Sequence, residues 1–341
     1  MAKILTKSPY FIQSSIANLD SCILKLYIYD ALQTTNRPIE ATYELKATAV
    51  NNSVTFEVGE LIGDYLDSDF DGTYETDVRW VDYTITQTIS GIQGTVSSFT
   101  QHYAVRGYSY FDEGANYDSV SGLLTASNYK QKLSTETIDI PFNTNKVSDY
   151  DVCNVGGGVT NVTVGNSNSS TNQIDYVTVP ANCSHVDFNL DAGGTETLYI
   201  ENVSECKHTP YRFTFLNKEG VLEDVWMFKR SQLSTEVKSK EYMNNQINGS
   251  SFYSTNNHQF RKINISSKEK LSVNSGFVRE EENETFKQLI SSEKVWVKFE
   301  SQILPVNIKS ESMEFKTRLN DKLINYSLDI EFAFNKINTV R

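Results

Sequence analysis

Apolar and polar residues alternate along several segments of this chain, and this period of two is typical of β-strands with one buried face. The segment 316–337 shows the alternation most strictly. One face carries Tyr326, Leu328, Ile330, Phe332 and Phe334. The opposite face carries Asn325, Ser327, Asp329, Glu331 and Asn335. The pattern predicts a strand in an antiparallel sheet that buries one side.

A second segment, 211–231, predicts a β-hairpin. Tyr211, Phe213 and Phe215 alternate with other residues up to the polar run 217–220, and apolar residues resume at 225–228. Asn and Gly favour tight turns because both tolerate left-handed backbone angles. The polar run therefore reverses the chain between two paired strands.

The first 145 residues contain further alternating runs, which favour strands separated by polar turns and hence a β-sandwich. These runs lie at 24–28, 43–49, 54–58 and 80–89. Residues 60–66 place Leu61, Ile62 and Tyr65 on one side and predict one short helical turn.

The composition changes at 151–194, where Gly, Asn, Ser, Thr and Val dominate. Such a run cannot build a large core, and it has more valines than a flexible linker, so we predict an extended arm or short exposed hairpins. In the following part, apolar residues at helical spacing predict a short helix near 281–293. The predicted fold is mainly β, with one or two short helices and two β-sandwich-like domains, 1–150 and 195–341, joined by an extended Gly/Asn/Ser-rich β arm at 151–194.

Charge is distributed unevenly along the chain. Residues 1–200 hold 10 Lys/Arg and 24 Asp/Glu, whereas residues 201–341 hold 21 and 19. The acidic part repels phosphate and the remainder lacks a cluster of Lys/Arg, so we expect no direct nucleic-acid binding. No apolar run reaches the ~20 residues that a membrane helix needs, and the first residues lack the apolar stretch of a secretory signal. We therefore expect no membrane insertion.

Residues 67–72 place carboxylates at alternate positions before a glycine. A tight loop of this kind presents several hard oxygen ligands to Ca²⁺. The predicted ligands are Asp67, Asp69, Asp71 and Glu75. The match is partial, because Val78 stands where an EF-hand loop requires Glu. The alternative is an acidic surface turn between strands.

Two Cys-x-His pairs, Cys183 with His185 and Cys206 with His208, suggest a zinc site. Residues two apart on a strand point to the same face, so the two pairs could meet as four ligands. Their spacing differs from that of common structural zinc sites. Buried thiols and surface histidines are the alternative, and the wide spacing of the cysteines favours reduced thiols over disulfides.

Catalytic motifs of comparable strength do not occur in the sequence. It contains four histidines but neither a GxSxG elbow nor a Cys-His protease signature. His102 lies in an aromatic run, 99–111, that favours core packing, with carbohydrate stacking as the alternative. The paired carboxylates of a glycosidase need no fixed spacing, but nothing here supports them. We expect no enzyme activity and no cofactor other than the predicted calcium.

Five segments of the carboxyl-terminal part are strings of fold-specifying rather than catalytic residues; they are 206–231, 272–281, 291–297, 303–308 and 316–341. Together they resemble the carboxyl region of virion structural proteins of tailed bacteriophages, often those of Bacteroidota hosts or marine bacteria. The run 56–66 is similar to a segment that commonly precedes this region there. The resemblance implies a β-rich architecture and a virion context, without a particular position in the particle.

Together, these observations predict a structural subunit of a tailed-phage virion, in the tail, baseplate or head–tail connector. We expect it to be made in the host cytoplasm, to form a symmetric homo-oligomer and to contact other virion structural proteins. The predicted interface comprises Gly156–Thr178 and exposed aromatics near Trp226 and Trp296. The alternative is a β-sandwich of the phage tail that recognises a glycan or receptor, with calcium bound at the acidic loop.

Overall fold

The computed structural model describes residues 2–30, 36–118, 121–164, 173–245, 254–310 and 324–336. These residues form many strands, three short α-helices and one 3-10 turn, so the predicted mainly β class with few helices is confirmed. The chain divides into two compact units. Unit 1 comprises Met1–Ser204, Thr214–Val225 and Glu281–Glu293; unit 2 comprises Glu205–Phe213, Trp226–Glu280 and Lys294–Arg341.

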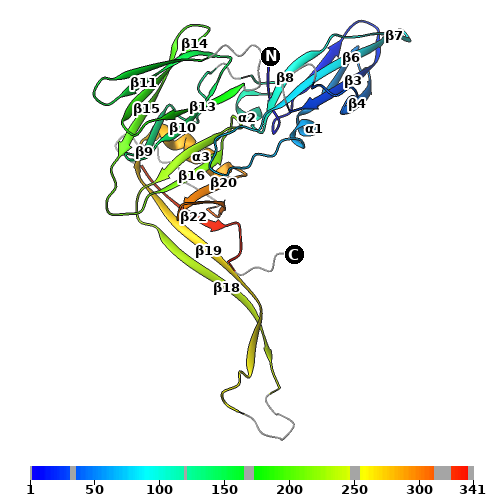
Figure 1. Ribbon diagram of the computed structural model, residues 1–341. Helices are drawn as coiled ribbons and strands as arrows, with labels where there is room; N and C mark the ends of the chain where they lie inside the picture. The colour runs from blue at the N-terminus through cyan, green and yellow to red at the C-terminus, as the bar shows by residue number, and fades with distance from the viewer. Residues whose placement is uncertain are drawn as a thin grey trace. The chain divides into compact units, whose positions relative to one another are not determined.

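The first part of unit 1 is a sandwich of a six-stranded and a two-stranded sheet (Figure 1). The larger sheet has the order β1 (Lys3–Leu5), β8 (Thr100–Val105), β6 (Arg79–Ile89), β3 (Leu19–Tyr29) and β4 (Tyr43–Thr48), and β7 (Ile92–Val96) pairs with β6. The smaller sheet pairs β2 (Phe11–Ser15) with β5 (Ser53–Glu57). Leu24, Phe56 and Val81 belong to their common core, which α1 (Gly59–Gly63) completes with Ile62. A second short helix, α2 (Tyr110–Glu113), follows β8.

The second part of unit 1 is another sandwich. Its five-stranded sheet has the order β12 (Val159–Thr163), β11 (Val147–Asn154), β14 (Cys183–Leu190), β15 (Thr195–Val203) and β9 (Tyr129–Leu133). Its two-stranded sheet pairs β10 (Ile138–Asn143) with β13 (Ile174–Val179). Phe142, Val152 and Phe188 contribute to the core between the sheets.

This sandwich corrects the expected organisation of 151–194. The boundary predicted at residue 150 falls inside β11, and β13 and β14 supply buried residues to a core, so this segment is not an extended arm between two domains. The physical reason is that its valines and Phe188 alternate well enough to bury one face against β10 and β15. Only the β11–β12 hairpin matches the expected exposed hairpins, with β12 exposed throughout. Residues 165–172 lie outside the described part of the chain.

Unit 2 is built on a seven-stranded sheet (Figure 1). Its order is β17 (Leu222–Met227), β16 (Tyr211–Leu216), β20 (Val295–Phe299), β21 (Gln302–Ile308), β22 (Ile324–Phe332), β19 (Phe260–Val278) and β18 (Gln232–Met243). The predicted hairpin is confirmed as β16 and β17, which pass into unit 1 at the turn between them. The predicted helix is confirmed as the 3-10 turn Glu280–Glu282 followed by α3 (Asn283–Ser291).

The last strand confirms most of the predicted alternation. Leu328 and Ile330 are buried in β22, and Asp329 is exposed. Two positions differ from the prediction. Phe334 is 70% exposed because β22 ends at Phe332, and Glu331 is buried because the amines of Lys268 and Lys309 lie 2.7 Å and 3.6 Å from its carboxylate. Residues 316–323, part of the same prediction, lie outside the described residues.

Candidate functional site

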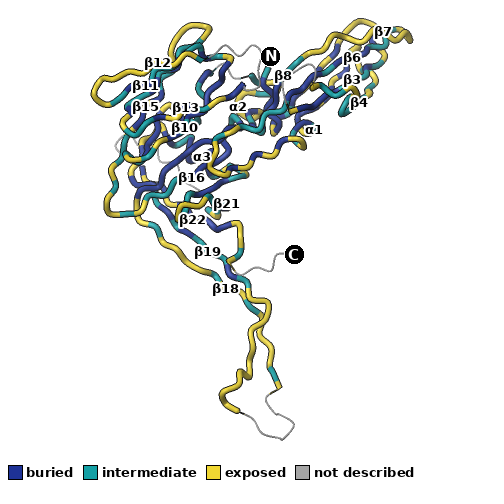
Figure 2. The backbone as a smooth tube through the Cα atoms, in the orientation of Figure 1, coloured by how far each residue is buried: buried dark blue, intermediate teal, exposed yellow. Residues whose placement is uncertain are grey.

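The most exposed feature of unit 2 is the long antiparallel hairpin of β18 and β19. The two strands pair from Gln232 with Ser272 to Met243 with Phe260. On its other side β19 pairs with β22 only between Lys270 and Val278, so the distal part of the hairpin is a two-stranded ribbon (Figure 1). No residue of β18 is buried, and Figure 2 shows the same exposure along the distal part of β19.

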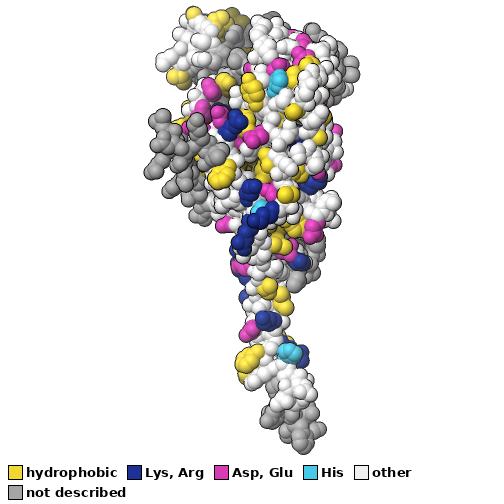
Figure 3. Space-filling model, turned by 90° about the vertical axis from the view of Figure 1, so that its left-hand side faces the viewer, with side chains coloured by type: hydrophobic (Ala, Val, Ile, Leu, Met, Phe, Trp, Pro, Cys, Tyr) yellow, Lys and Arg dark blue, Asp and Glu magenta, His cyan; other side chains and the backbone are white. Residues whose placement is uncertain are grey.

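The hairpin carries several apolar side chains that are exposed to solvent. They are Leu233, Val237, Tyr242, Met243, Phe260, Ile263 and Ile265. Figure 3 shows such side chains along the ribbon, interspersed with basic ones. Leu233 lies opposite Leu271, which in turn lies opposite Ile330. The exposed fraction is 1% for Leu271 and Ile330 but 49% for Leu233. The apolar face of the sheet therefore continues onto the edge strand β18, where it is not covered.

The hairpin is also basic and carries one irregularity. Residues 229–270 hold 8 Lys/Arg and 3 Asp/Glu, in contrast to the acidic first 200 residues. The register shifts between Lys238 and Lys240, where Asn264 on the partner strand has a left-handed φ of 52°. Such a bulge increases the local twist of a ribbon. The sequence analysis did not single out this hairpin because its apolar residues follow no strict period, and its excess of Lys was the available signal.

The acidic loop brings three of the four predicted calcium ligands to one place. Asp67, Asp69 and Glu75 line an open hollow of about 400 Å³ in unit 1, together with Asp30 and Asp77. The lining of this hollow does not include Asp71, whose carboxylate accepts a hydrogen bond from the backbone of Thr73 at 2.9 Å.

Part of the negative charge in this hollow is already neutralised. Arg79 lies 2.5 Å from Asp30 and 3.5 Å from Asp77, and burial raises the pKa of Asp77. In the described residues, the group that brings three possible ligand atoms within 4.8 Å of one another lies elsewhere. The calcium site stays a prediction.

The two Cys-x-His pairs behave differently from the expectation. Cys206 and His208 belong to unit 2, and Cys183 and His185 to unit 1. Cys183 and His185 do not share a face, because Ser184 is an extra residue in the pairing of β14 with β11: Cys183 lies opposite Asn154 and His185 opposite Cys153. The bulge turns Cys183 into the core, at 0% exposure. All four cysteines are described, and each is a free thiol.

His185 instead joins two residues that the sequence analysis did not select. Cys153, His185 and Asp187 each offer one possible ligand atom, and these atoms lie within 4.8 Å of one another. Nε2 of His185 lies 3.7 Å from Oδ2 of Asp187. No spacing in the sequence could have shown this group, because Cys153 meets His185 only through the strand register.

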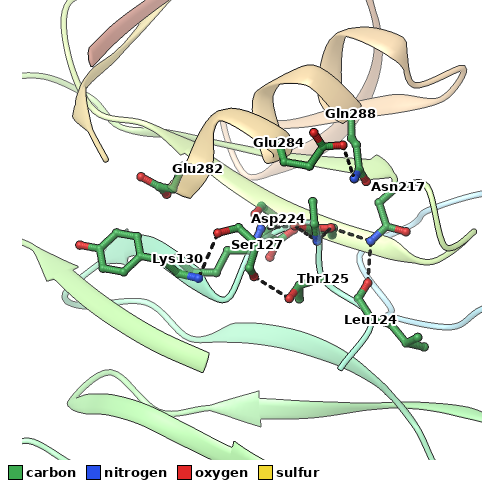
Figure 4. Close-up of polar contacts among 12 residues, drawn as sticks. Leu124, Thr125, Ser127, Lys130, Asn217, Asp224, Glu282, Glu284 and Gln288 are labelled. Carbon is green, nitrogen blue, oxygen red and sulfur yellow. Dashed lines mark hydrogen bonds and ion pairs between the residues drawn. The ribbon is translucent and has the colours of Figure 1, made fainter. Parts of the chain in front are cut away.

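A buried polar network in unit 1 holds the turn of the β16–β17 hairpin (Figure 4). Lys130 on β9 forms an ion pair with Glu223 on β17. Glu223 also accepts hydrogen bonds from the backbone of Ala126, at 3.0 Å, and from Nδ2 of Asn217, at 2.6 Å. The same amide nitrogen donates to the carbonyl of Leu124 at 2.8 Å.

The network extends to Asp224 and to α3. The carboxylate of Asp224 accepts from the hydroxyls of Tyr74 and Thr214, with both donors at 2.7 Å from Oδ1. On α3, Oε1 of Gln288 accepts from the backbone of Lys218 at 2.9 Å. The charged groups of this network pair with one another and with nearby backbone groups. The network therefore positions the turn and is not available to bind a substrate.

A larger groove of about 800 Å³ in unit 1 lies beside α1 and the first residues of the chain. Lys7 and Arg106 are its basic residues, and both pair with Glu293. Burial and the neighbouring Arg106 lower the pKa of Lys7. The acidic lining residues Glu57, Glu60 and Asp64 outnumber these bases. The groove therefore offers no uncompensated positive charge to an anionic ligand.

The aromatic candidates divide between core and surface. His102 stacks on Tyr83 with the ring centroids 5.6 Å apart, and burial lowers the pKa of its imidazole, so core packing describes it better than sugar binding. Trp226 and Trp296, named as neighbours of an interface, are buried at 5% and 6% exposure. Phe277 is exposed at 62%. Of the predicted interface at Gly156–Thr178, residues 156–164 and 173–178 are described, and the former include the exposed strand β12.

Comparison with known proteins identifies no family for this chain. No family model matches it, and no curated protein does. A solved structure with partial similarity is the CupB2 chaperone of Pseudomonas aeruginosa, at 10% sequence identity and a TM-score of 0.21, with 59% of this chain and 97% of that chain covered. A TM-score this low does not indicate a shared fold or function. Among the described residues, no helix is long and apolar enough to cross a membrane.

Proposed function

We propose that this protein is a structural subunit of a tailed-phage virion that assembles as a symmetric oligomer through the β18–β19 hairpin. The observation that carries the proposal is the exposed apolar and basic surface of this hairpin. The resemblance of the carboxyl-terminal segments to virion structural proteins supports the virion context. The tail, baseplate and head–tail connector are the proposed positions, with other virion structural proteins as further partners.

An isolated two-stranded ribbon is marginally stable in water, and its free edge invites another chain. β18 is the last strand of its sheet, and within the described part of the chain its 12 residues have no strand on their outer side. Leu233 and Val237, at 49% and 56% exposure, lie on the face that is buried further into the sheet. A partner that covers this face removes apolar surface from water at about 25 cal/mol per Å².

The partner we infer is a second copy of the same chain. The hairpin segment 229–270 has 8 Lys/Arg against 3 Asp/Glu, and residues 1–200 have 10 against 24. A basic hairpin on one copy and an acidic surface on the next are complementary, and a head-to-tail contact of this kind repeats around a closed ring. In this proposal the hairpin takes the assembly role that the sequence analysis gave to Gly156–Thr178.

Native mass spectrometry of the purified chain over a series of salt concentrations tests this assembly. We expect one closed oligomer of a single copy number at low salt, and a shift toward monomer as salt screens the charged contact. Negative-stain images of the same sample should show rings. A monomer at every salt and protein concentration contradicts the proposal.

Mass spectrometry of particles from the phage that encodes the chain tests the virion context. If the chain is absent from purified particles, the virion context is rejected.

A further inference from the structure

Cys153, His185 and Asp187 converge on the face of the β11–β14 sheet that lies away from its apolar core. Their neighbours Val152, Val186 and Phe188 point into that core and belong to one cluster of buried residues. Cys153 lies directly opposite His185, and Asp187 follows two residues later on β14. Strand pairing within unit 1 therefore brings the three side chains together, independently of any loop.

Ser184 determines which nitrogen of His185 carries the proton. The Ser184 hydroxyl donates its single hydrogen to the carbonyl oxygen of Cys153 at 3.0 Å. Oγ of Ser184 also lies 3.0 Å from Nδ1 of His185, so Oγ accepts there and Nδ1 donates. In the neutral imidazole, Nε2 then keeps its lone pair for another partner.

The atom that Nε2 of His185 faces is also an acceptor. Oδ2 of Asp187 lies 3.7 Å away, and Oδ1 of the same carboxylate accepts from the hydroxyl of Thr197 at 2.6 Å, which fixes its orientation. Two acceptors held toward each other are stabilised by a cation between them, which can be a metal ion or a proton on the imidazole. A proton on the imidazole would pair His185 with Asp187 but would leave Cys153 without a role. The sulfur of Cys153 beside them completes a mixed N, O and S donor set, which is the chemistry of a zinc site.

We propose that Sγ of Cys153, Nε2 of His185 and Oδ2 of Asp187 bind one Zn²⁺ ion, with water as the fourth ligand. The side chains of His185 and Asp187 are 35% and 29% exposed, which gives the ion and the water access. Ser184 and Thr197 act as orienting partners of the ligands, as the outer partners of zinc ligands commonly do. The ion links β11 to β14 beside the turn of the exposed β11–β12 hairpin, where Cys153 also lies opposite Val159.

The thiol has to lose its proton when the metal binds. Burial, with the nearby carboxylates of Asp187 and Asp151, raises the pKa of Cys153, so the free site holds a neutral thiol. A divalent cation reverses this preference, and each Zn²⁺ that binds releases one proton from Cys153 to solvent. The Zn–S bond replaces the S–H bond, and no oxidation or reduction takes place.

Titration of the metal-free full chain with Co²⁺ tests the site, because a thiolate ligand gives Co²⁺ a sulfur-to-metal charge-transfer band that oxygen and nitrogen ligands lack. We expect one ion per chain, the charge-transfer band, and displacement of Co²⁺ by Zn²⁺. Cys153→Ser should abolish the band. Thr197→Val keeps all three ligands and should weaken the affinity roughly 10-fold or more.

Cys206→Ser is the matched control, because Cys206 is the exposed thiol of the chain and should not contribute. A band that persists in Cys153→Ser, or that is lost in Cys206→Ser, assigns the ion to another thiol and overturns the proposal. Absence of stoichiometric binding overturns it as well. Circular dichroism reports whether each variant folds, and His185→Gln, at a partly exposed position, replaces Cys153→Ser if the latter does not fold.

Discussion

Lys130 and Glu223 form an ion pair inside unit 1 in which the two side chains are 2% and 1% exposed. Glu223 also accepts hydrogen bonds from Ala126 and Asn217, so its carboxylate is surrounded by donors. Burying two charges costs desolvation energy that the pairing only offsets, and such pairs are better explained by the specific geometry they impose. Here that geometry holds β17 against β9 and fixes the turn at Asn217.

Substitution of Lys130 by Met should lower the free energy of unfolding by about 3–5 kcal/mol, because Glu223 would keep a buried charge without its counterion. Urea denaturation followed by tryptophan fluorescence measures the change. Lys46→Met is the control: Lys46 is 67% exposed beside Glu44, and exposed pairs of this kind contribute less than about 1 kcal/mol. Equal losses in the two variants would show that the buried pair has no special role.

Gly107 and the turn of the β16–β17 hairpin approach so closely that neither side has room for a methyl group. A Cβ on Gly107 would lie 2.6 Å from the carbonyl oxygen of Lys218, and a Cβ on Gly220 would lie 2.9 Å from the backbone nitrogen of Gly107. We expect Gly107→Ala to destabilise unit 1 by about 1–3 kcal/mol through overpacking.

Thermal melting compares Gly107→Ala with Gly158→Ala. The nearest neighbour of a Cβ on Gly158 is the side chain of Asn154, at 3.6 Å, so the control should change stability by less than about 0.5 kcal/mol. A neutral Gly107→Ala would mean that the backbone at Lys218 moves aside without cost.

Local alternation in the sequence was enough to predict several individual strands. The segment around Leu328 and the hairpin after Tyr211 have strict periods of two, and both are strands in the structure. The grouping of strands into units was not predictable in the same way, because β16 and β17 pass from one unit into the other. The segment 151–194 shows the same limit: its composition resembles an arm, yet its buried residues complete a core that distant strands supply.

The candidate metal group depended on a single irregularity that composition does not reveal. A regular strand places Cys183 and His185 on one face, and the extra residue Ser184 in the pairing separates them. The same bulge puts His185 opposite Cys153, 32 positions earlier in the chain. Strand register decides which side chains meet, and register is set by pairing between segments rather than within one.

Glu205 should titrate far below the ordinary range for a glutamate. A hydrogen bond from the amine of Lys229, helped by the backbone N–H groups of Lys207 and His208, lowers the pKa of its carboxyl from 4.5 to about 2. Because the folded-state pKa is the lower one, the charged carboxylate stabilises the fold above pH 4.5, and this contribution is lost as the pH falls toward 2.

Carbon-13 NMR of the Glu205 carboxyl measures this titration, with an expected midpoint near 2. Lys229→Met removes the main donor and should raise the midpoint toward 4.5. The difference in melting temperature between the native chain and Glu205→Gln should narrow as the pH drops through the same window. A midpoint that does not respond to Lys229→Met would show that the two side chains do not interact in solution.

Charge reversal on the β18–β19 hairpin should separate assembly from folding. Lys240 and Lys262 are exposed on the distal ribbon, away from the sheet core, so Lys240→Glu with Lys262→Glu should leave the melting temperature almost unchanged. The oligomer should dissociate at salt concentrations where the native chain stays assembled, because an acidic hairpin repels the acidic surface of the next copy.

The control for this prediction is Lys46→Glu with Lys287→Glu, which makes the same change of net charge at exposed positions outside the hairpin and should preserve the oligomer. Equal loss of assembly in both double variants would mean that net charge alone governs association and that the hairpin is not the contact.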